Sequence, residues 1–197
     1  MPSNLTIDGE RLWRTIEASS VIGRGPNGGL RRLTLTDEDK QMRDLFARWA
    51  SEAGFAVRVD RLGNMFVRRE GQHPELPPVL IGSHLDTQAA GGRFDGILGV
   101  LGGLEVLRTL DESGIATPRA IEVVNWTNEE GARFYPPMLS SLVFAGKESV
   151  SWAEGRTDKG GLQLGDELAH RLSRRCTGRK SADRRLFRTS HRARTQA

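Results

Sequence analysis

Histidine and carboxylate side chains gather in two short stretches of the sequence. The first stretch, "IGSHLDTQAAGGRFDGILG", contains His84, Asp86 and Asp95, and the second, "VVNWTNEEG", contains the adjacent Glu129 and Glu130. Imidazole and carboxylate groups are the usual protein ligands of zinc, and carboxylates also bind manganese and similar ions. Together the two stretches predict a site for hydrolysis assisted by divalent metal ions.

The spacing of these side chains suggests different tasks for them. His84 and Asp86 lie two residues apart on an extended segment, so their side chains point to the same side. A carboxylate beside an imidazole fixes the tautomer of a metal-bound histidine, whereas the two oxygens of Asp95 could bridge a pair of ions. Neighbouring side chains diverge, so one glutamate of the Glu129–Glu130 pair would bind a metal while the other serves as a general base.

Each of these features alone also has a purely structural interpretation. A single His-x-Asp in a loop is most often structural, a lone Glu-Glu pair is more often a solvated face, and Gly-Gly-x-x-Asp-Gly is a common turn signal. All three features occur here at the ends of consecutive predicted strands. Because ligands of α/β sheets bind beyond the carboxyl ends of strands, the combination favours a metal site.

Local sequence signals predict the helices and strands that must position these stretches. Amphipathic helices are expected after the candidate N-caps Asp8 and Thr36, and a third helix is expected from Gly96 to Leu110. The alternating residues 55–70 predict a β-hairpin. The run "PPVLIGSHLD" predicts a central buried strand and "RAIEVVNWTNEEG" another, while "YPPMLSSLVFAGK" and "LQLGDELAHRL" predict short helices.

The order of elements α, α, β, β, β, α, β, α predicts the fold class. It is typical of a layered α/β/α domain with a mixed sheet, in which an antiparallel hairpin lies beside parallel strands joined by a crossover helix. Glycines 99, 102 and 103 of the third helix are expected to let it pack closely on the sheet. Residues 1–170 are expected to form one domain and residues 171–197 a basic, disordered tail.

Charge is divided unevenly along the chain. The formal net charge is +4, but residues 171–197 contain nine arginines, one lysine and one aspartate, which leaves residues 1–170 with a net charge of −5. An acidic body disfavours a specific nucleic-acid-binding protein, although the tail would bind phosphate non-specifically at low salt. The single cysteine, the absence of an apolar N-terminal signal, and the absence of a run of about 20 apolar residues predict a cytoplasmic protein without membrane contact.

Three longer segments resemble a known enzyme family. The segments "GSHLDT", "GGRFDGILGVLGGLEVLRTL" and "NWTNEEGARFYPPMLSSLVFAG" are similar to the N-terminal part of the N-carbamoyl-L-amino-acid hydrolase/allantoate amidohydrolase family, from about residue 8 to residue 170. That family belongs to the clan of dinuclear zinc peptidases that includes aminoacylases and carboxypeptidases. The resemblance implies an incomplete zinc-peptidase-like catalytic domain with two divalent ions, zinc or manganese, with cobalt and nickel as further options.

The resemblance also implies a role for each candidate residue. His84 would be a ligand of one metal, Asp95 the bridge and Glu130 a further ligand. Glu129 would be the general base, and Asp86 would orient His84. In the implied reaction, water deprotonated by Glu129 attacks the carbonyl carbon of an N-carbamoyl amino acid or an allantoate-like ureido substrate, and ammonia and carbon dioxide leave. An aminoacylase or peptidase of the same clan is the alternative.

Two departures from the family bear on activity. Family members are longer, with a second histidine ligand in a His-Ile-Glu-Gln-Gly motif and a smaller domain for dimerisation and substrate binding, and neither occurs here. The arginine-rich composition from about residue 173 resembles coding sequence read out of frame. We therefore expect a truncated chain that is weakly active or inactive, or a non-catalytic fragment with a basic tail, and homodimers only among full-length members. His73, His170 and His191 are not assigned to the site.

Overall fold

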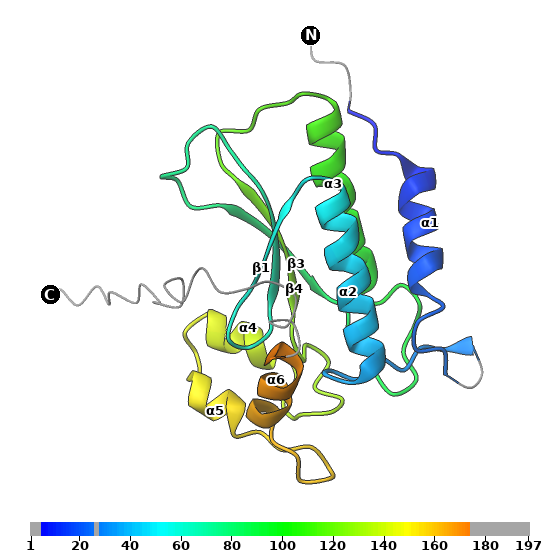
Figure 1. Cartoon of the computed structure of the whole chain (residues 1–197), viewed down its shortest axis with the longest axis vertical. Helices are drawn as coiled ribbons and strands as arrows, with labels where there is room; N and C mark the ends of the chain where they lie inside the picture. Colours follow the sequence, from blue (N-terminus) through cyan, green and yellow to red (C-terminus); the bar gives the residue numbers. More distant parts are fainter. Residues whose placement is uncertain (1–4, 26–27, 174–197) are drawn as a thin grey trace, which may run out of the picture.

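The computed structural model describes residues 5–25 and 28–173 (Figure 1). Long helices lie along one face of a four-stranded sheet, and short helices gather at one end of the sheet. Except for its first residues, the predicted basic tail lies outside the described residues, as does the expected change of reading frame. The structure therefore bears on the predicted domain of residues 1–170.

The first two helices begin where their capping residues predict. Helix α1 (Gly9–Ser19) is capped by Asp8, whose carboxylate accepts a hydrogen bond from a first-turn N–H at 2.9 Å. Helix α2 (Asp37–Glu52) is capped by Thr36, whose hydroxyl accepts from a first-turn N–H at 3.4 Å. A side-chain acceptor at this position satisfies a backbone donor that the helix leaves unpaired. Both predictions are confirmed.

The four strands form one mixed sheet in the order β1-β2-β4-β3. They are β1 (Ala56–Val59), β2 (Met65–Arg69), β3 (Val79–His84) and β4 (Ile121–Trp126). The pairs β1–β2 and β2–β4 are antiparallel, whereas β3 and β4 are parallel and are joined by helix α3 (Ile97–Glu112). The structure confirms the predicted hairpin beside two parallel strands with a crossover helix between them.

Strand β3 departs from the prediction because it lies at an edge of the described sheet. Strand β4 is flanked by β2 and β3, and its residues 122–125 are buried. In β3, by contrast, Val79 and Leu80 are 48% and 38% exposed, and burial is reached only at His84. An apolar run does not reveal which neighbours a strand will have, so the prediction of a central buried strand was wrong for this segment.

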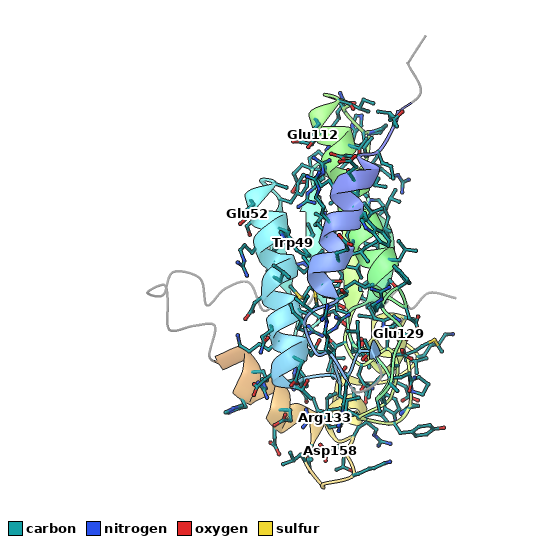
Figure 2. All side chains as sticks on the ribbon, turned by 90° about the vertical axis from the view of Figure 1, so that its right-hand side faces the viewer. Trp49, Glu52, Glu112, Glu129, Arg133 and Asp158 are labelled. Atoms are coloured by element: carbon teal, nitrogen blue, oxygen red, sulfur yellow. The ribbon has the colours of Figure 1, made fainter. Side chains whose placement is uncertain are left out.

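The main core lies between the sheet and the three long helices (Figures 1 and 2). Met42 and Phe46 of α2, Leu104 of α3, and Met65 and Val123 of the sheet are buried there. Removing apolar side chains from water stabilises a fold by about 25 cal/mol per Å². This core holds β3 and β4 side by side, and it thereby fixes the positions of the turns that follow them.

A smaller core lies beyond the carboxyl ends of β3 and β4. Its helices are α4 (Leu139–Phe144), α5 (Val150–Glu154) and α6 (Leu164–Ser173). Helices α4 and α6 were predicted, whereas α5 was not. Phe144 of α4 also packs against Phe66 and Trp126, with ring centroids 6.0 and 5.0 Å away. Because Phe66 alternates with the core residues of β2, this contact places a helix against the second face of the sheet.

Helix α3 packs closely on the sheet through two of its glycines. A Cβ atom at Gly99 would lie 2.6 Å from Ser83 Cβ, and one at Gly103 would lie 2.9 Å from Val123 Cγ2. Nothing lies within 4 Å of the corresponding position at Gly102. The prediction of close packing is confirmed for Gly99 and Gly103 and wrong for Gly102. Although α3 is rich in apolar residues, no helix among the described residues combines the length and apolar character that a membrane crossing requires.

Candidate metal centre

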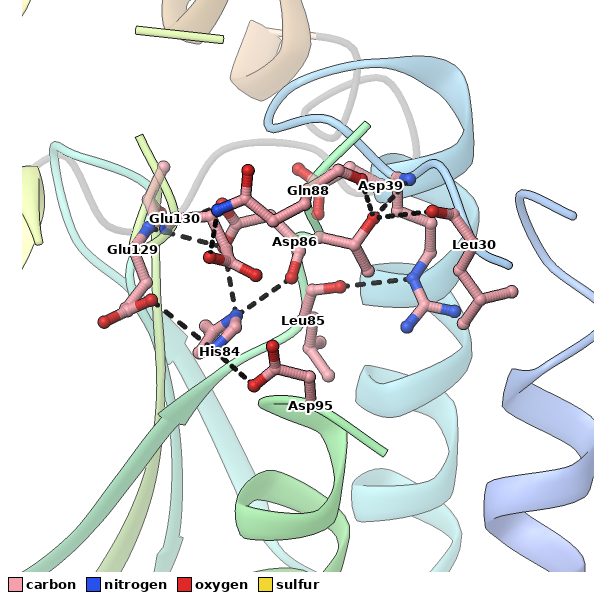
Figure 3. Close-up of polar contacts among 12 residues, drawn as sticks. Leu30, Asp39, His84, Leu85, Asp86, Gln88, Asp95, Glu129 and Glu130 are labelled. Carbon is pink, nitrogen blue, oxygen red and sulfur yellow. Dashed lines mark hydrogen bonds and ion pairs between the residues drawn. The ribbon is translucent and has the colours of Figure 1, made fainter. Parts of the chain in front are cut away.

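The predicted site residues meet at the carboxyl ends of the two parallel strands (Figure 3). His84 is the last residue of β3, Asp86 follows two residues later, and Asp95 lies just before α3. Glu129 and Glu130 lie in the turn that follows β4. Because β3 and β4 are adjacent and run in the same direction, their ends bring both groups of side chains to one place.

The ligand atoms of His84, Asp95 and Glu130 are arranged in a way that suits a divalent ion. One potential ligand atom from each lies within 4.8 Å of the others. His84 Nε2 is 3.9 Å from Asp95 Oδ1 and 3.4 Å from Glu129 Oε2. Glu130 Oε2 accepts a hydrogen bond from Gln88 Nε2 at 2.6 Å, but Glu130 Oε1 is buried without a hydrogen-bond partner among the described residues. Such an oxygen is costly to bury, and a bound cation would satisfy it.

The His84 ring is held in an orientation that suits a metal ligand. Its Nδ1 donates to the backbone carbonyl of Asp86 at 2.9 Å, which leaves Nε2 directed toward Asp95 and Glu129. The ring rests on Gly96, which has a φ of +68° and where a Cβ would overlap the imidazole. The Asp86 carboxylate is 3.7 Å from Nδ1. The backbone of Asp86, and not its side chain as expected, therefore makes the hydrogen bond to His84.

The Asp86 carboxylate instead joins the two ligand-bearing turns. It is buried, and its two oxygens accept hydrogen bonds from Glu129 N and Glu130 N, each at 3.4 Å. Burial, and next the nearby Asp39 carboxylate, raise the pKa of Asp86 above its usual range, while His84 acts in the opposite direction. Asp86 thus connects the chain after β3 to the chain after β4.

The turn after β4 has an unusual backbone that directs the two glutamates. Asn128 has a φ of +57°, a left-handed conformation that asparagine adopts more readily than most residues. Its side-chain amide donates to the Phe134 carbonyl at 2.6 Å, and its side-chain oxygen accepts from Phe134 N at 3.3 Å. The Glu129 carbonyl accepts from Met138 N at 2.6 Å. Sequence reasoning missed Asn128, although an asparagine before the Glu-Glu pair is a readable signal for such a turn.

Sequence reasoning also missed three buried charged residues behind the site. Asp39 and Arg43 of α2 and Arg32 of the preceding loop are buried, although side chains of these types are seldom buried. Arg43 Nε pairs with Asp39 Oδ2 at 2.9 Å. Desolvation lowers the pKa of Arg32 to about 10. The spacing of four residues between Asp39 and Arg43 was a readable signal, since it places both on one face of a helix. Arg32 stands in a glycine-rich loop and offered no such periodicity.

One segment of the chain matches the sequence model of a known family. Residues 80–164 match the sequence model of Peptidase family M20/M25/M40, and the match contains all the predicted site residues.

Named relatives narrow the likeness to amidohydrolases. The chain is 52% identical over 165 residues to the N-carbamoyl-L-amino-acid amidohydrolase of Rhizobium meliloti, an alignment that covers 84% of this chain and 40% of the relative. It is 34% identical over 153 residues to the ureidoglycolate hydrolase of Arabidopsis thaliana, covering 78% of this chain and 32% of that relative. A crystal structure of a hydantoinase/carbamoylase family amidase from Burkholderia ambifaria matches with a TM-score of 0.84 and 55% identity, over 85% of this chain and 42% of that chain. The chain thus spans about 40% of the length of the Rhizobium relative.

Proposed function

We propose that this chain contributes the metal-binding part of an amidohydrolase that cleaves the carbamoyl C–N bond of N-carbamoyl-L-amino acids. The observation that carries the proposal is the approach of ligand atoms from His84, Asp95 and Glu130 to within 4.8 Å of one another. The relatives supply the substrate class, since one is named for N-carbamoyl-L-amino acids and another for ureidoglycolate. Both names describe a ureido group, whose carbonyl carbon is the point of attack.

His84, Asp95 and Glu130 would hold divalent metal ions, and the two carboxylate oxygens of Asp95 would allow it to be shared between two ions. Zinc and manganese suit a donor set of one imidazole and several carboxylates, and cobalt or nickel would also bind it. When bound, such ions polarise the substrate carbonyl and neutralise the negative charge that develops on its oxygen. Gln88 holds Glu130 Oε2 by a hydrogen bond, so that Oε1 stays available as a ligand atom.

Glu129 serves as the general base in this proposal. Its side chain is 29% exposed, which lets it meet both water and substrate, and its Oε2 lies 3.4 Å from His84 Nε2. Glu129 Oε2 takes a proton from the attacking water and returns it to the leaving nitrogen. Asp86 accepts a hydrogen bond from Glu129 N and so fixes the backbone from which this base extends.

The 197-residue chain by itself is expected to turn over N-carbamoyl amino acids weakly or not at all. Within the described part of the chain, one group of three candidate ligands suits a metal, whereas a tetrahedral zinc site takes about three protein ligands for each ion. The homodimer expected of the longer proteins and the cytoplasmic location expected of this chain stay predictions, as does the choice between zinc and manganese.

A chimera tests the proposed activity. Residues 1–170 would replace the corresponding part of the Rhizobium meliloti relative, with which the chain is 52% identical. We expect the zinc- or manganese-loaded chimera to release ammonia from N-carbamoyl-L-amino acids. Glu129→Gln should lower kcat about 100-fold or more, because the general base is lost.

The outcomes of this experiment separate the alternatives. A folded, metal-loaded chimera without activity would contradict the proposal, and so would an unchanged kcat in Glu129→Gln. Preferential hydrolysis of N-acetyl amino acids would favour an aminoacylase or peptidase of the same clan.

A further inference from the structure

Two buried arginines lie behind the candidate metal centre, and each contacts one of the turns that carry its ligands. Arg32 contacts the chain after β3, and Arg43 contacts the chain after β4. Arg32 is 0% exposed and Arg43 is 7% exposed. A buried guanidinium is strongly destabilising unless its N–H groups find acceptors, so the acceptors show what each arginine holds.

Arg32 fixes the turn after β3 with both its side chain and its backbone. Its Nε donates to the carbonyl of Leu85, the residue that follows His84, at 3.1 Å. Its backbone N–H donates to Thr87 Oγ1 at 2.8 Å, and its carbonyl accepts from Thr87 N at 2.9 Å. Its Nη1 donates to the carbonyl of Ser19, the last residue of α1, at 3.0 Å and to the carbonyl of Ile22, just beyond that helix, at 3.2 Å. The segment that begins with His84 is therefore tied to α1 through this one residue.

Arg43 holds the turn after β4 in a comparable way. Its Nη2 donates to Thr127 Oγ1 at 3.0 Å, and its Nη1 donates to the Gly63 carbonyl at 2.7 Å. Thr127 N in turn donates to Asn64 Oδ1 at 2.9 Å. Because Thr127 stands two residues before Glu129, these contacts tie the glutamate turn to α2 and to the turn of the β1–β2 hairpin.

Two aspartates link these arginines in one buried group of charges. Asp39 pairs with Arg43 at 2.9 Å. In the part of the chain that the structure describes, Arg32 forms no ion pair, but the charges of Asp39 and Asp86 both act on it. Asp86 also accepts from the N–H groups of both glutamates of the second turn. Each turn is thus held by an arginine, and Asp86 connects the two turns.

Stability alone does not account for this arrangement. Replacing buried ionic groups with apolar residues of similar volume is often neutral or stabilising. Here Arg32 Nη2 and Asp39 Oδ1 are buried without hydrogen-bond partners among the described residues. Groups that break the usual rules of burial are retained where they serve a site. Residues behind the ligands of a metal commonly change its affinity 10- to 100-fold.

We propose that Arg32 and Arg43 are positioning residues of the metal centre, each of which fixes the backbone of one ligand-bearing turn. Arg32 positions His84, and Arg43 positions Glu129 and Glu130. The inference rests on the proposed metal site, but it concerns residues that touch neither the ligand atoms nor the substrate.

Hydrogen exchange of the metal-free chain tests each arginine against its own turn. Arg32→Met should speed amide exchange in residues 84–88, and Arg43→Met should speed it in residues 127–131, each about ten-fold or more, because local opening becomes easier. Arg69→Met is the matched control, since Arg69 Nη2 donates to a backbone carbonyl at the opposite end of the sheet, at 2.6 Å. It should leave exchange in both turns unchanged.

Cobalt binding supplies a second readout, which a purely structural role would not alter. Arg32→Met and Arg43→Met should weaken Co²⁺ binding 10- to 100-fold and should change the cobalt absorption spectrum at saturation, which reports ligand geometry. Arg69→Met should lower stability to urea without changing either quantity. If a methionine variant does not fold, Arg32→Lys and Thr127→Val replace it. In Arg32→Lys the charge stays but the planar guanidinium is lost. In Thr127→Val the side chain keeps its shape but no longer has the hydroxyl oxygen that accepts from Arg43.

Each outcome either supports or overturns the proposed role of the two arginines. Unchanged exchange in the two turns would overturn the inference, as would equal effects of Arg69→Met. Equal cobalt binding by all variants contradicts the inference alone and leaves the proposed function standing. A chain that binds no divalent ion contradicts the proposed function and this inference together.

Discussion

Buried charges are used differently at the two ends of the sheet. Where β3 and β4 finish, Arg32 is buried and donates to backbone carbonyls, with no carboxylate pair among the described residues. Toward the other end, Arg11 of α1 donates to both carboxylate oxygens of Glu105 of α3, at 2.9 and 2.7 Å. In Figure 2, Glu112, a further partner of Arg11, lies near one end of the molecule, well apart from Glu129 of the candidate site.

This comparison distinguishes two uses of buried charges: some join two helices, and others support the candidate site. A forked arginine–carboxylate pair is strong and specific in geometry, and the pair of Arg11 and Glu105 fixes α1 against α3. At the site end, Glu130 Oε1 and Arg32 Nη2 lack hydrogen-bond partners within the described ranges. Incomplete pairing is expected where the structure is kept ready for a ligand. Substitutions at the two ends should therefore affect metal affinity and stability independently.

Asp95→Asn should produce the largest change at the site end. The Asp95 side chain is 64% exposed, so its substitution should change the free energy of unfolding by less than about 0.5 kcal/mol. Removing one of three candidate ligands should weaken zinc binding about 100-fold or more. Calorimetric zinc titration and urea unfolding measure the two quantities. Unchanged zinc affinity would mean that the ion does not bind at Asp95.

Arg11→Met should lower stability and leave zinc affinity unchanged, the opposite of what we expect for Asp95→Asn. Glu105 is 1% exposed and would remain buried without its main partner, which should lower the free energy of unfolding by about 2 kcal/mol. The value is below that of a fully buried pair because Arg11 is 29% exposed and solvent screens its charge. Zinc affinity should stay the same. A parallel loss of zinc affinity would show that the two ends are coupled.

Gly96→Ala should affect both quantities, because this glycine supports the His84 ring. At a φ of +68° alanine is strained, and its Cβ would overlap the imidazole, so we expect a loss of about 1–2 kcal/mol in stability. Displacement of the ring should weaken zinc binding about ten-fold. Urea unfolding and zinc titration of the same preparation provide the measurement. A stable variant with full zinc affinity would contradict the role given to Gly96.

Gly102→Ala should have the smallest effect overall, and it should stabilise the chain, whereas Arg11→Met and Gly96→Ala should destabilise it. Nothing lies within 4 Å of the Cβ position in this helical glycine, so alanine should raise the free energy of unfolding by up to about 1 kcal/mol through its higher helix propensity. Thermal unfolding measures the gain, and zinc affinity should not change. Destabilisation would show that Gly102 has a packing role that the structure does not reveal.

Local sequence signals predicted most helices and strands of this fold. They did not predict which strands lie next to one another in the sheet. The caps Asp8 and Thr36 placed the first two helices, because capping depends on contacts within a few residues. The edge position of β3 depends on its pairing with β4, in which Val79 lies opposite Ile121. An apolar run contains no information about a partner so distant in the sequence.

The sequence predicted the residues of the candidate site that carry metal-ligand atoms, but not the residues that hold them in position. The sequence indicated metal binding through His84, Asp95 and the Glu-Glu pair. Imidazole and carboxylate side chains carry the donor atoms that metal ions bind, so their residue types alone suggest this chemistry. The supporting contacts of Arg32 and Arg43 join segments from four different parts of the chain. Only the folded structure brings those acceptors together, so sequence reasoning assigned neither arginine to the site.

Metal binding by the purified chain tests the central claim most directly. Equilibrium dialysis against zinc, manganese and cobalt, followed by elemental analysis, would compare the unsubstituted chain with His84→Ala and with the control His73→Ala. His73 is exposed in the loop before β3, away from the site end of that strand. We expect at least one bound ion per chain in the unsubstituted chain and in His73→Ala, and a loss of binding in His84→Ala. No binding by the unsubstituted chain, or equal binding by all three, would contradict the account.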